Sequence, residues 1–375
     1  MGQRQGAVAT LGIMMTPSFW QGRRVFLTGH TGFKGSWLAL WLWRLGARTT
    51  GYALPPSAAP NLFELADVGS RLDSVIADIN DADGLRIAMQ AAQPEVVLHL
   101  AAQPLVRASY DQPAQTFATN VMGTVNLLEA VRATPTVRAV VVVTTDKCYL
   151  NREWIWGYRE TDHLGGHDPY SASKAGTELV AAAYRASFFK DGVSIATARA
   201  GNVIGGGDFA PDRLLPDCVR AIEAGVDLDI RYPDAVRPWQ FVLEPLAGYL
   251  ELAERAYAAE PSVADAWNFG PDGGAGHRTV REVVQAFAAV TTARHPLRLR
   301  FGMREPQPHE ATLLALDTSK ARAYLSWRPQ LDFQESLAWT IDWYRAYLAR
   351  EDLHALSVQQ LDAYLARLRT PNARL

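Results

Sequence analysis

The first half of the chain alternates between short apolar segments and longer segments with helical spacing. The strand-like stretches cover residues 24–29, 48–54, 96–102, 140–145 and 193–200, and the helix-like stretches cover residues 34–45, 119–133 and the segment after Pro169. Such a βαβ rhythm is typical of a parallel sheet with helices on both faces. We therefore expect an α/β fold with a doubly wound parallel sheet.

A glycine-rich loop follows the first predicted strand. The stretch LTGHTGFKG places Gly29, Gly32 and Gly35 at three-residue intervals before a predicted helix. Glycines let the backbone turn tightly and approach a pyrophosphate, which then sits at the positive helix N-terminus. This context predicts a Rossmann-type dinucleotide site. The stretch GYALPP, after the second predicted strand, has no acidic residue to bind the ribose 2′-OH, so this feature does not decide between NAD and NADP. It also has no clustered arginines for a 2′-phosphate, which favours NAD.

The character of the sequence changes after Asn202, where a Gly/Pro-rich stretch, GGGDFAPDRLLPD, begins. Elements from there to about residue 350 are shorter and mixed. We expect a disordered leader at residues 1–20, an NAD-binding Rossmann domain at 21–202, a smaller mixed α/β substrate lobe at 203–350 with some segments returning to the first domain, and a helical extension at 351–375.

Composition argues against several classes of protein. The chain has 375 residues, of which 48% are hydrophobic, and a formal net charge of −2 gives no electrostatic reason to expect nucleic acid or an anionic membrane. No apolar run reaches the ~20 residues of a membrane span. Two cysteines and eight histidines without ligand spacing predict neither a disulfide framework nor a metal site. We expect a cytoplasmic protein.

The stretch YSASK places Tyr170 and Lys174 four residues apart, on one face of a predicted helix. The ammonium, together with a positive nicotinamide, is expected to lower the pKa of the tyrosine from ~10 toward neutrality. A tyrosine so activated takes the proton from a sugar hydroxyl while hydride leaves the same carbon. An ordinary surface pair is the alternative, but the glycine loop and Thr145 at the end of a predicted strand favour catalysis.

These motifs, with RAGNVIGGGD, resemble the extended short-chain dehydrogenase/reductase family, specifically its nucleotide-sugar 4,6-dehydratases. Longer stretches are similar to the branch that acts on CDP-glucose: GHTGFKGSWL, AAQPLVR, DKCYLNREWIWGYRE, DRLLPD and RPWQFVLEPL. The resemblance spans roughly residues 22–345. It implies NAD as cofactor, CDP-glucose as substrate and a homodimer or homotetramer.

The resemblance also implies roles for individual residues. The implied catalytic residues are Thr145, Asp146, Lys147, Tyr170 and Lys174. The implied cofactor-binding residues are Gly29, Thr31, Gly32, Phe33, Lys34, Gly35, Asp78, Ile79, Leu100, Ala101, Ala102, Thr119, Tyr170 and Lys174. The implied substrate-binding residues are Asn202, Arg213, Leu214, Arg237 and His309.

The apolar run Val140–Thr145 ends in an acid and a base side by side, Asp146 and Lys147. Most sugar-nucleotide 4,6-dehydratases have Asp-Glu here, whereas the CDP-glucose branch has Lys. The implied reaction oxidises C4, eliminates water across C5 and C6 and returns the hydride to C6. Elimination needs an acid for the departing hydroxyl and a base for the C5 proton. Our hypothesis is that protonated Asp146 is the acid and Lys147 the base; alternatively, Lys147 stays charged and stabilises the enolate.

Two kinds of rival function stay open. One is a 4,6-dehydratase of GDP-mannose or dTDP-glucose, or a nucleotide-sugar epimerase, although epimerases need no elimination pair. The other is a non-catalytic dinucleotide sensor, which typically lacks the Tyr or the Lys. We also expect the Trp-rich helix and His99 to be core residues, His30 to be a candidate phosphate contact, and NREWIWGYRE to be a candidate substrate lid.

Overall fold

The computed structural model of the protein describes residues 16–190, 192–230, 232–271, 277–289, 296–302 and 313–369. Its centre is a seven-stranded sheet with the order β11-β6-β5-β4-β1-β2-β3, in which every pair of neighbours is parallel. The strands are β1 (Arg24–Thr28), β2 (Arg48–Ala53), β3 (Asp73–Ile76), β4 (Val96–His99), β5 (Ala139–Val143), β6 (Ser194–Ala200) and β11 (Ala266–Phe269). The predicted doubly wound parallel sheet is confirmed.

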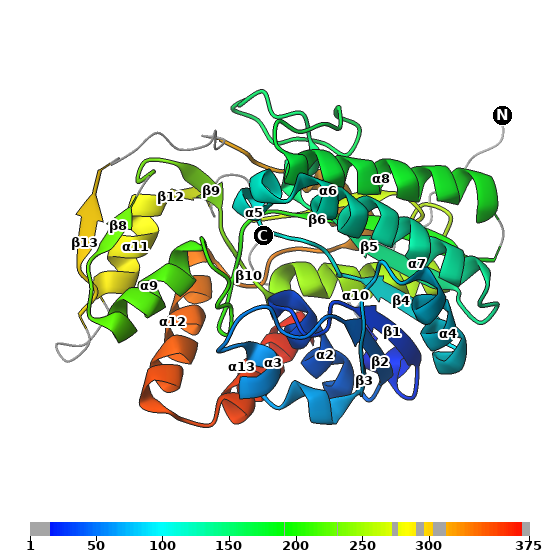
Figure 1. The fold of residues 1–375 in the computed structure, drawn as a ribbon, viewed down its shortest axis with the longest axis horizontal. Coiled ribbons are helices and arrows are strands. Elements are labelled where there is room, and N and C mark those ends of the chain that lie inside the picture. Colours follow the sequence, from blue (N-terminus) through cyan, green and yellow to red (C-terminus); the bar gives the residue numbers. More distant parts are fainter. Residues whose placement is uncertain are drawn as a thin grey trace, which may run out of the picture.

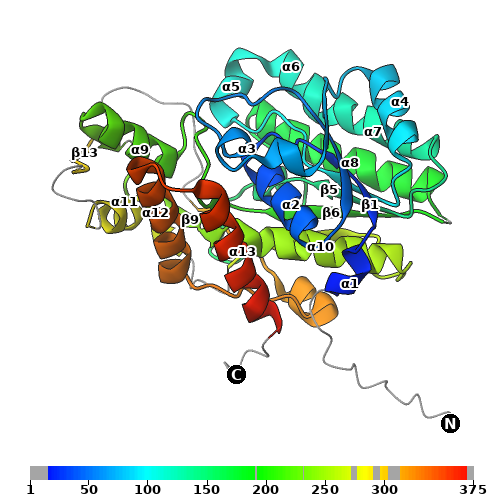
Figure 2. The ribbon, with the colours of Figure 1, turned by 90° about the horizontal axis from the view of Figure 1, so that it is seen from below.

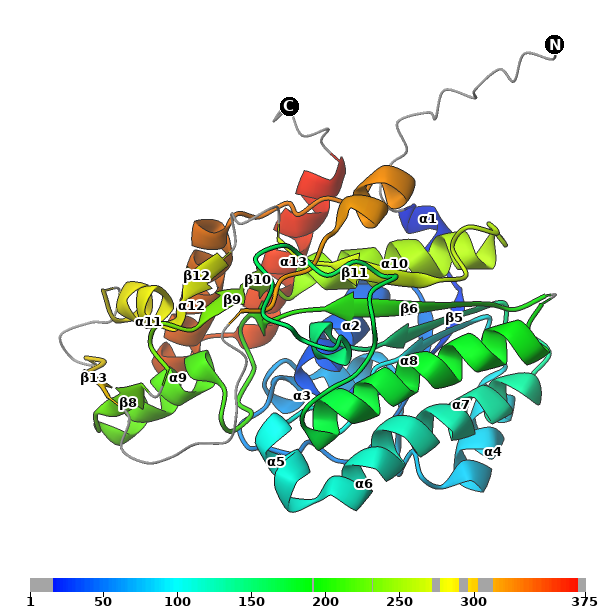
Figure 3. The same ribbon diagram turned by 90° about the horizontal axis from the view of Figure 1, so that it is seen from above.

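Helices cover both faces of this sheet (Figures 1 and 3). On β1, Phe26 packs into one apolar core while Val25 and Leu27 pack into the other, as the two-residue period of a strand requires. The helices of the first face are α4 (Ala82–Ala92), α7 (Gly123–Arg132) and α8 (Pro169–Phe188). Those of the second face include α2 (Phe33–Arg44) and α10 (Leu243–Tyr257). The second core is the larger because segments from the C-terminal half join it.

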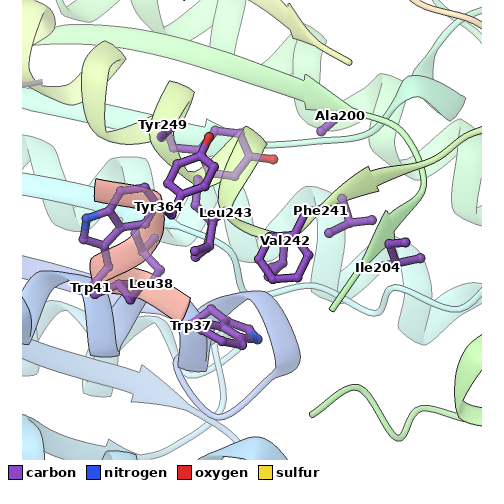
Figure 4. Close-up of a cluster of buried hydrophobic side chains, with 14 of the residues drawn as sticks. Trp37, Leu38, Trp41, Ala200, Ile204, Phe241, Val242, Leu243, Tyr249 and Tyr364 are labelled. Atoms are coloured by element: carbon purple, nitrogen blue, oxygen red, sulfur yellow. The ribbon is translucent and has the colours of Figure 1, made fainter. Parts of the chain in front are cut away.

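Helix α2 carries the Trp-rich sequence, and its Trp37 and Trp41 are fully buried (Figure 4). The ring of Tyr364, on α13 (Leu353–Arg369), packs edge-on against Trp41 with 5.6 Å between the ring centres. Figure 2 shows α13 lying beside α2, next to α12 (Phe333–Ala349). The prediction that the Trp-rich helix is a core helix is confirmed.

The predicted leader is wrong for its last residues. Pro17–Trp20 form the short helix α1, and Trp20 is completely buried against the second core because its indole ring is large and apolar. The folded part of the protein therefore includes residues that we had placed in a disordered segment. Residues 1–15 lie outside the described part of the chain.

The smaller lobe is built from short, mixed elements. Two small sheets pair β9 with β12 in antiparallel fashion and β8 with β13 in parallel, while β7 and β10 pair beside the main sheet. The elements are β7 (Val203–Ile204), α9 (Leu214–Ala224), β8 (Leu228–Ile230), β9 (Val236–Pro238), β10 (Gln240–Phe241), β12 (His277–Thr279), α11 (Val280–Ala289) and β13 (Leu299–Phe301). The lobe stands to one side of the sheet (Figure 1).

The remaining elements are short. They are α3 (Leu62–Leu65), α5 (Val106–Asp111), α6 (Pro113–Phe117), the 3₁₀ turns Val68–Arg71 and Asp146–Cys148, and the π-helical turns Ala118–Met122 and Ala321–Leu325. None of the helices in the described ranges is long and apolar enough to cross a membrane. In the same ranges no group of three or more His, Cys, Asp or Glu side chains could hold a metal ion.

Candidate active site

The glycine loop between β1 and α2 leaves no room for a side chain at Gly29 or at Gly35. Gly29 has a φ of +76°, and a Cβ atom there would lie 2.7 Å from the backbone nitrogen of Ala101, at the end of β4. A Cβ on Gly35 would lie 1.9 Å from the carbonyl oxygen of Gly29. Gly32 caps α2 without a side-chain hydrogen bond, so no side chain occupies the first N–H groups of the helix. This geometry suits an anionic group such as a pyrophosphate.

The other residues predicted for the cofactor lie along the same edge of the sheet. The backbone N–H groups of Leu100 and Ala101 both donate to Thr28 Oγ1 at 3.1 Å, which fixes the segment that continues to Ala102. Ile79 is buried against Gly123, and Thr119 lies in the π-helical turn that leads to Gly123. Two others have polar side chains that are already hydrogen-bonded within the protein: Asp78 accepts from Asn80, and Thr31 donates to the carbonyl of Leu54 at 2.8 Å.

His30 points away from the phosphate edge of the loop. Its Nε2 lies 2.7 Å from Ser74 Oγ, and its ring fills the space beside Gly51, where a Cβ would lie 2.5 Å from the imidazole. Burial lowers the pKa of His30 to about 4, so the ring is neutral. The prediction of a phosphate contact is therefore not supported by the direction of this side chain.

His99 bridges β1 and α7 inside the core, as predicted. Thr28 Oγ1 already accepts two backbone hydrogen bonds, so it donates its proton to His99 Nδ1, 2.7 Å away. The other ring nitrogen, Nε2, therefore carries the hydrogen and faces Thr124 Oγ1 at 3.2 Å. Burial, with a smaller contribution from Lys174, lowers the pKa of His99 to about 3. The imidazole is a neutral hydrogen-bonded core group.

Tyr170 and Lys174 come together because of how α8 begins. The Asp168 carboxylate accepts a hydrogen bond from the backbone N–H of Ser171 at 2.9 Å, and Pro169 occupies the first helical position. Tyr170 is therefore in the first turn, and Lys174 one turn later. The Lys174 Nζ donates to the carbonyl oxygen of Val143, at the end of β5, at 3.2 Å.

Burial opposes the expected lowering of the Tyr170 pKa. Burial raises the pKa of Tyr170 to about 12, and a hydrogen bond with Thr145 and the charge of Arg213 offset only part of that effect. Burial also lowers the pKa of Lys174 to about 8, so this side chain is closer to deprotonation than an ordinary lysine. Desolvation thus outweighs the helical Tyr–Lys spacing as long as no further positive charge is present.

Only one of the two carboxylate oxygens of Asp146 has a hydrogen-bond partner. Its Oδ1 accepts a hydrogen bond from Thr145 Oγ1 at 3.0 Å and lies 3.9 Å from Lys147 Nζ. Its Oδ2 is buried without a hydrogen-bond partner and faces Gly201, where a Cβ would lie 3.0 Å away. Within the described part of the chain it is the single buried carboxylate oxygen in this condition. The Lys147 side chain is 27% exposed.

The predicted substrate residues that the structure describes lie in or next to the smaller lobe. Arg213 precedes Leu214, the first residue of α9, and its guanidinium lies 3.5 Å from Asp208 Oδ2. Arg237, on β9, is buried and adjoins Pro238, which packs against Gly201 beside Asn202. His309 lies outside the described residues.

Lys34, predicted to bind the cofactor, directs its ammonium group toward α10. Its Nζ donates to the hydroxyl of Tyr249, on α10, at 3.5 Å. Burial lowers the pKa of Lys34 to about 7, with Arg213 and Lys174 acting in the same direction and Asp146 against it. Sequence reasoning missed Tyr249 because nothing local shows that α10 packs behind β5.

The loop after Lys147 is anchored by aromatic stacking. Trp154 stacks on Tyr158 with 5.5 Å between ring centres, and Tyr158 stacks on Tyr149 at 5.2 Å. At its tip Ile155 and Trp156 are 86% and 59% exposed. A role as a substrate lid stays a prediction.

Comparison with known proteins gives a consistent picture. The family model described as GDP-mannose 4,6 dehydratase matches residues 26–340. The chain is 48% identical over 360 residues to a CDP-glucose 4,6-dehydratase of Salmonella typhimurium, covering 94% of this chain and 99% of the relative. It is 32% identical to a dTDP-glucose 4,6-dehydratase of Xanthomonas campestris pv. campestris, covering 85% and 92%.

Two solved structures share the fold. The dTDP-glucose 4,6-dehydratase DesIV of Streptomyces venezuelae, with NAD and TYD bound, has a TM-score of 0.73 at 24% identity and covers 88% of this chain and 99% of that one. A UDP-glucose-4-epimerase of Stenotrophomonas maltophila, with NAD and formylated UDP-arabinopyranose, has a TM-score of 0.74 at 23% identity and covers 88% and 99%. At these identities the likeness concerns the fold.

Proposed function

Because the chain belongs to the GDP-mannose 4,6-dehydratase family, we propose that it converts CDP-glucose to CDP-4-keto-6-deoxyglucose and water, as an NAD-dependent hydro-lyase. The observation that carries the proposal is the partnerless, buried Asp146 Oδ2 beside Thr145, Tyr170 and Lys174. An oxidation site alone would need no such oxygen, whereas an elimination needs an acid. The 48% identity to a CDP-glucose 4,6-dehydratase supports the choice of substrate.

The residues at the glycine loop fit NAD. The first turn of α2 would hold the pyrophosphate, Ile79 would contact the adenine, and Lys174 would bind the nicotinamide ribose. When bound, NAD would accept the C4 hydride and later return it to C6, while a proton returns to C5. The overall reaction is therefore redox-neutral, and the cofactor is recycled.

In the first step Tyr170 removes the proton of the C4 hydroxyl. Burial raises its pKa to about 12, so the phenolate has to be stabilised by the surrounding cations and by its hydrogen bond with Thr145. Arg213 supplies positive charge on the protein side. The oxidised carbon becomes a ketone, which acidifies the neighbouring C5 proton.

In the second step Asp146 donates a proton to the departing C6 hydroxyl. Its Oδ2 is the atom that is free to carry this proton, since Oδ1 accepts the hydrogen bond of Thr145 whenever that hydroxyl is not donating to the Tyr170 phenolate. Lys147, 3.9 Å from Oδ1, removes the C5 proton. If Lys147 instead stays charged, its role is to stabilise the enolate, and another base acts at C5.

Replacing Lys147 with Met distinguishes these two roles. We expect the variant to oxidise C4 but to exchange the C5 hydrogen with solvent deuterium about 10²-fold more slowly, since a positioned base contributes on that order. The matched control is Lys147→Arg, which keeps the charge but cannot be deprotonated. Mass spectrometry of the keto intermediate measures the exchange. Normal exchange in the Arg variant would reject the base role in favour of the electrostatic one.

The substrate is tested by incubating the purified protein with NAD⁺ and, separately, CDP-glucose, dTDP-glucose, UDP-glucose and GDP-mannose. We expect loss of one water, seen by mass spectrometry, from CDP-glucose alone. Loss of water from another of these sugars would agree with the proposed mechanism but reject CDP-glucose as the substrate. An isomer without water loss would identify an epimerase instead.

We further propose a homodimer or homotetramer formed through the cofactor domain. Exposed apolar side chains support this: Phe117 on α6, Met122 in the adjoining π-helical turn, and Leu179 on α8, which contacts both. A cytoplasmic location is proposed from the two cysteines, Cys148 and Cys218, which are buried free thiols.

A further inference from the structure

A buried ion pair lies beside the 3₁₀ turn Asp146–Cys148, which carries the proposed acid and base and is called the catalytic turn below. The Glu178 carboxylate of α8 accepts a hydrogen bond from Arg199 Nη2 of β6 at 2.8 Å, and the two side chains are 3% and 4% exposed. Burial alone would raise the pKa of Glu178, but Arg199 helps to hold it below its usual value, so the carboxylate is ionised. Two opposite charges are therefore enclosed next to the catalytic turn.

The ion pair is hydrogen-bonded to the chain on both sides of the catalytic turn. Thr144, two residues before Asp146, donates its hydroxyl hydrogen to Glu178 Oε1. Tyr149, the residue directly after the turn, accepts a hydrogen bond from Arg199 Nη1 at 2.8 Å through its hydroxyl oxygen. The residues that enter and leave the turn are thus bonded to the same pair of charges.

The strand end of the catalytic turn has a second anchor. The backbone N–H of Thr144 donates to the carbonyl oxygen of Ala198, on β6, at 2.8 Å, so the pairing of β5 with β6 continues to this residue. Thr145, which hydrogen-bonds Tyr170, follows directly. The sheet therefore positions the groups of the oxidation step even without the ion pair.

The other end of the catalytic turn depends on a side chain. The backbone hydrogen bonds there, from Gly165 to Cys148 and from Leu150 to His163, join it only to another part of the same loop. The Tyr149 hydroxyl joins it to the sheet, because it accepts from Arg199 on β6 and donates to Asn268 Oδ1 on β11 at 2.7 Å. Loss of this hydroxyl would release one end of the turn and leave the other in place.

We propose that Glu178 and Arg199 are positioning residues for the catalytic turn. Through Tyr149 they hold the turn where Asp146 and Lys147 reach the C5–C6 bond of the sugar. The proposal rests on the function proposed above, in which those two residues carry out the elimination. A buried ion pair is often no more stabilising than apolar residues of the same volume, so its directional bonds to both sides of the turn point to a role in geometry.

Tyr149→Phe is the mildest test, because it removes one oxygen and keeps the ring that stacks on Tyr158. In a single turnover of CDP-glucose we expect the variant to oxidise C4 at a rate within a few-fold of the parent. We expect it to lose water about 10²-fold more slowly, the effect of misplacing a reacting group by about 1 Å. The absorbance of the reduced nicotinamide measures the first step, and quenching followed by mass spectrometry measures the second.

Tyr364→Phe is the matched control. It removes the hydroxyl of another fully buried tyrosine, on α13, which donates to Glu244 Oε2 at 2.7 Å. We expect this variant to keep the parent ratio of the two rates. The double variant Glu178→Gln/Arg199→Met removes both charges without leaving either unpaired, and it should slow water loss at least as much as Tyr149→Phe. If it does not fold, Tyr149→Phe decides alone.

Hydrogen–deuterium exchange of the protein without cofactor or sugar tests the positioning itself. We expect the backbone amides of residues 147–149 to exchange about tenfold faster in Tyr149→Phe and those of β5 to be unchanged, since only one end of the turn loses an anchor. Parent-like exchange in the turn, or an equal slowing of oxidation and water loss, would overturn the proposal. A parent protein that dehydrates no sugar nucleotide would instead reject the proposed function, and the exchange rates would still show whether the ion pair holds the turn.

Discussion

Tyr170→Phe is expected to lower kcat/KM for CDP-glucose by about 10³-fold, within the range for loss of a positioned acid–base group. The substitution removes a single oxygen from a side chain that is 8% exposed, so the packing of α8 is preserved. The lost hydroxyl is the one that hydrogen-bonds Thr145 and whose pKa burial raises to about 12. Without it no group at this position can accept the C4 proton, and the first step fails.

The matched control is Tyr184→Phe, which removes a hydroxyl from the same helix outside the site, where it donates to Glu129 Oε1 at 2.7 Å. We expect that variant to keep activity within a few-fold of the parent. Steady-state rates report the whole reaction, and the transient absorbance of the reduced nicotinamide during a single turnover reports the oxidation step. If Tyr170→Phe still reduced the cofactor at the parent rate, Tyr170 would not be the base.

Asp146→Asn is expected to stop the reaction after C4 oxidation. The asparagine keeps an oxygen to accept the hydrogen bond from Thr145, but it replaces the partnerless Oδ2 by an amide that cannot transfer a proton to the C6 hydroxyl. Loss of a general acid costs about 10²- to 10⁴-fold, so formation of the deoxy sugar should fall by about that factor. The oxidised sugar and the reduced cofactor should accumulate together.

Rapid mixing with CDP-glucose, followed by quenching and mass spectrometry, tests this expectation. The informative comparison is with Tyr170→Phe, in which neither the oxidised sugar nor the dehydrated product forms. Parent-like water loss from Asp146→Asn would exclude Asp146 as the acid. Loss of both steps would show instead that Asp146 is needed to shape the site.

The strands of the sheet could be predicted because each carries its own signal. The run of valines at 140–143 has the composition of a strand buried on both faces, and β5 is indeed flanked by β4 and β6. The glycine loop was equally readable, since its spacing reflects a local steric requirement. Both conclusions depend only on residues that are close together in the sequence.

What the sequence did not provide was information about burial and distant contacts. The spacing of Tyr170 and Lys174 could be read from the sequence. The burial that raises the pKa of Tyr170 and lowers the pKa of Lys174 could not. Glu178 follows Lys174 by one helical turn, yet its ion pair is with Arg199 on β6, which no local pattern predicts. Tyr249 reaches the site only because α10 packs against the sheet, and no local pattern in 243–257 predicts which face it covers.

The late position of α10, β11 and α13 has a consequence for how the chain is synthesised. These elements complete the second face and one edge of the sheet, but they are synthesised late, since they begin at residues 243, 266 and 353. At about 5–20 residues per second, on the order of ten seconds pass between the emergence of β6 and that of α13. During that interval the nascent chain presents Trp37, Trp41 and the apolar side of β5 to the cell, and we expect chaperones to bind it there.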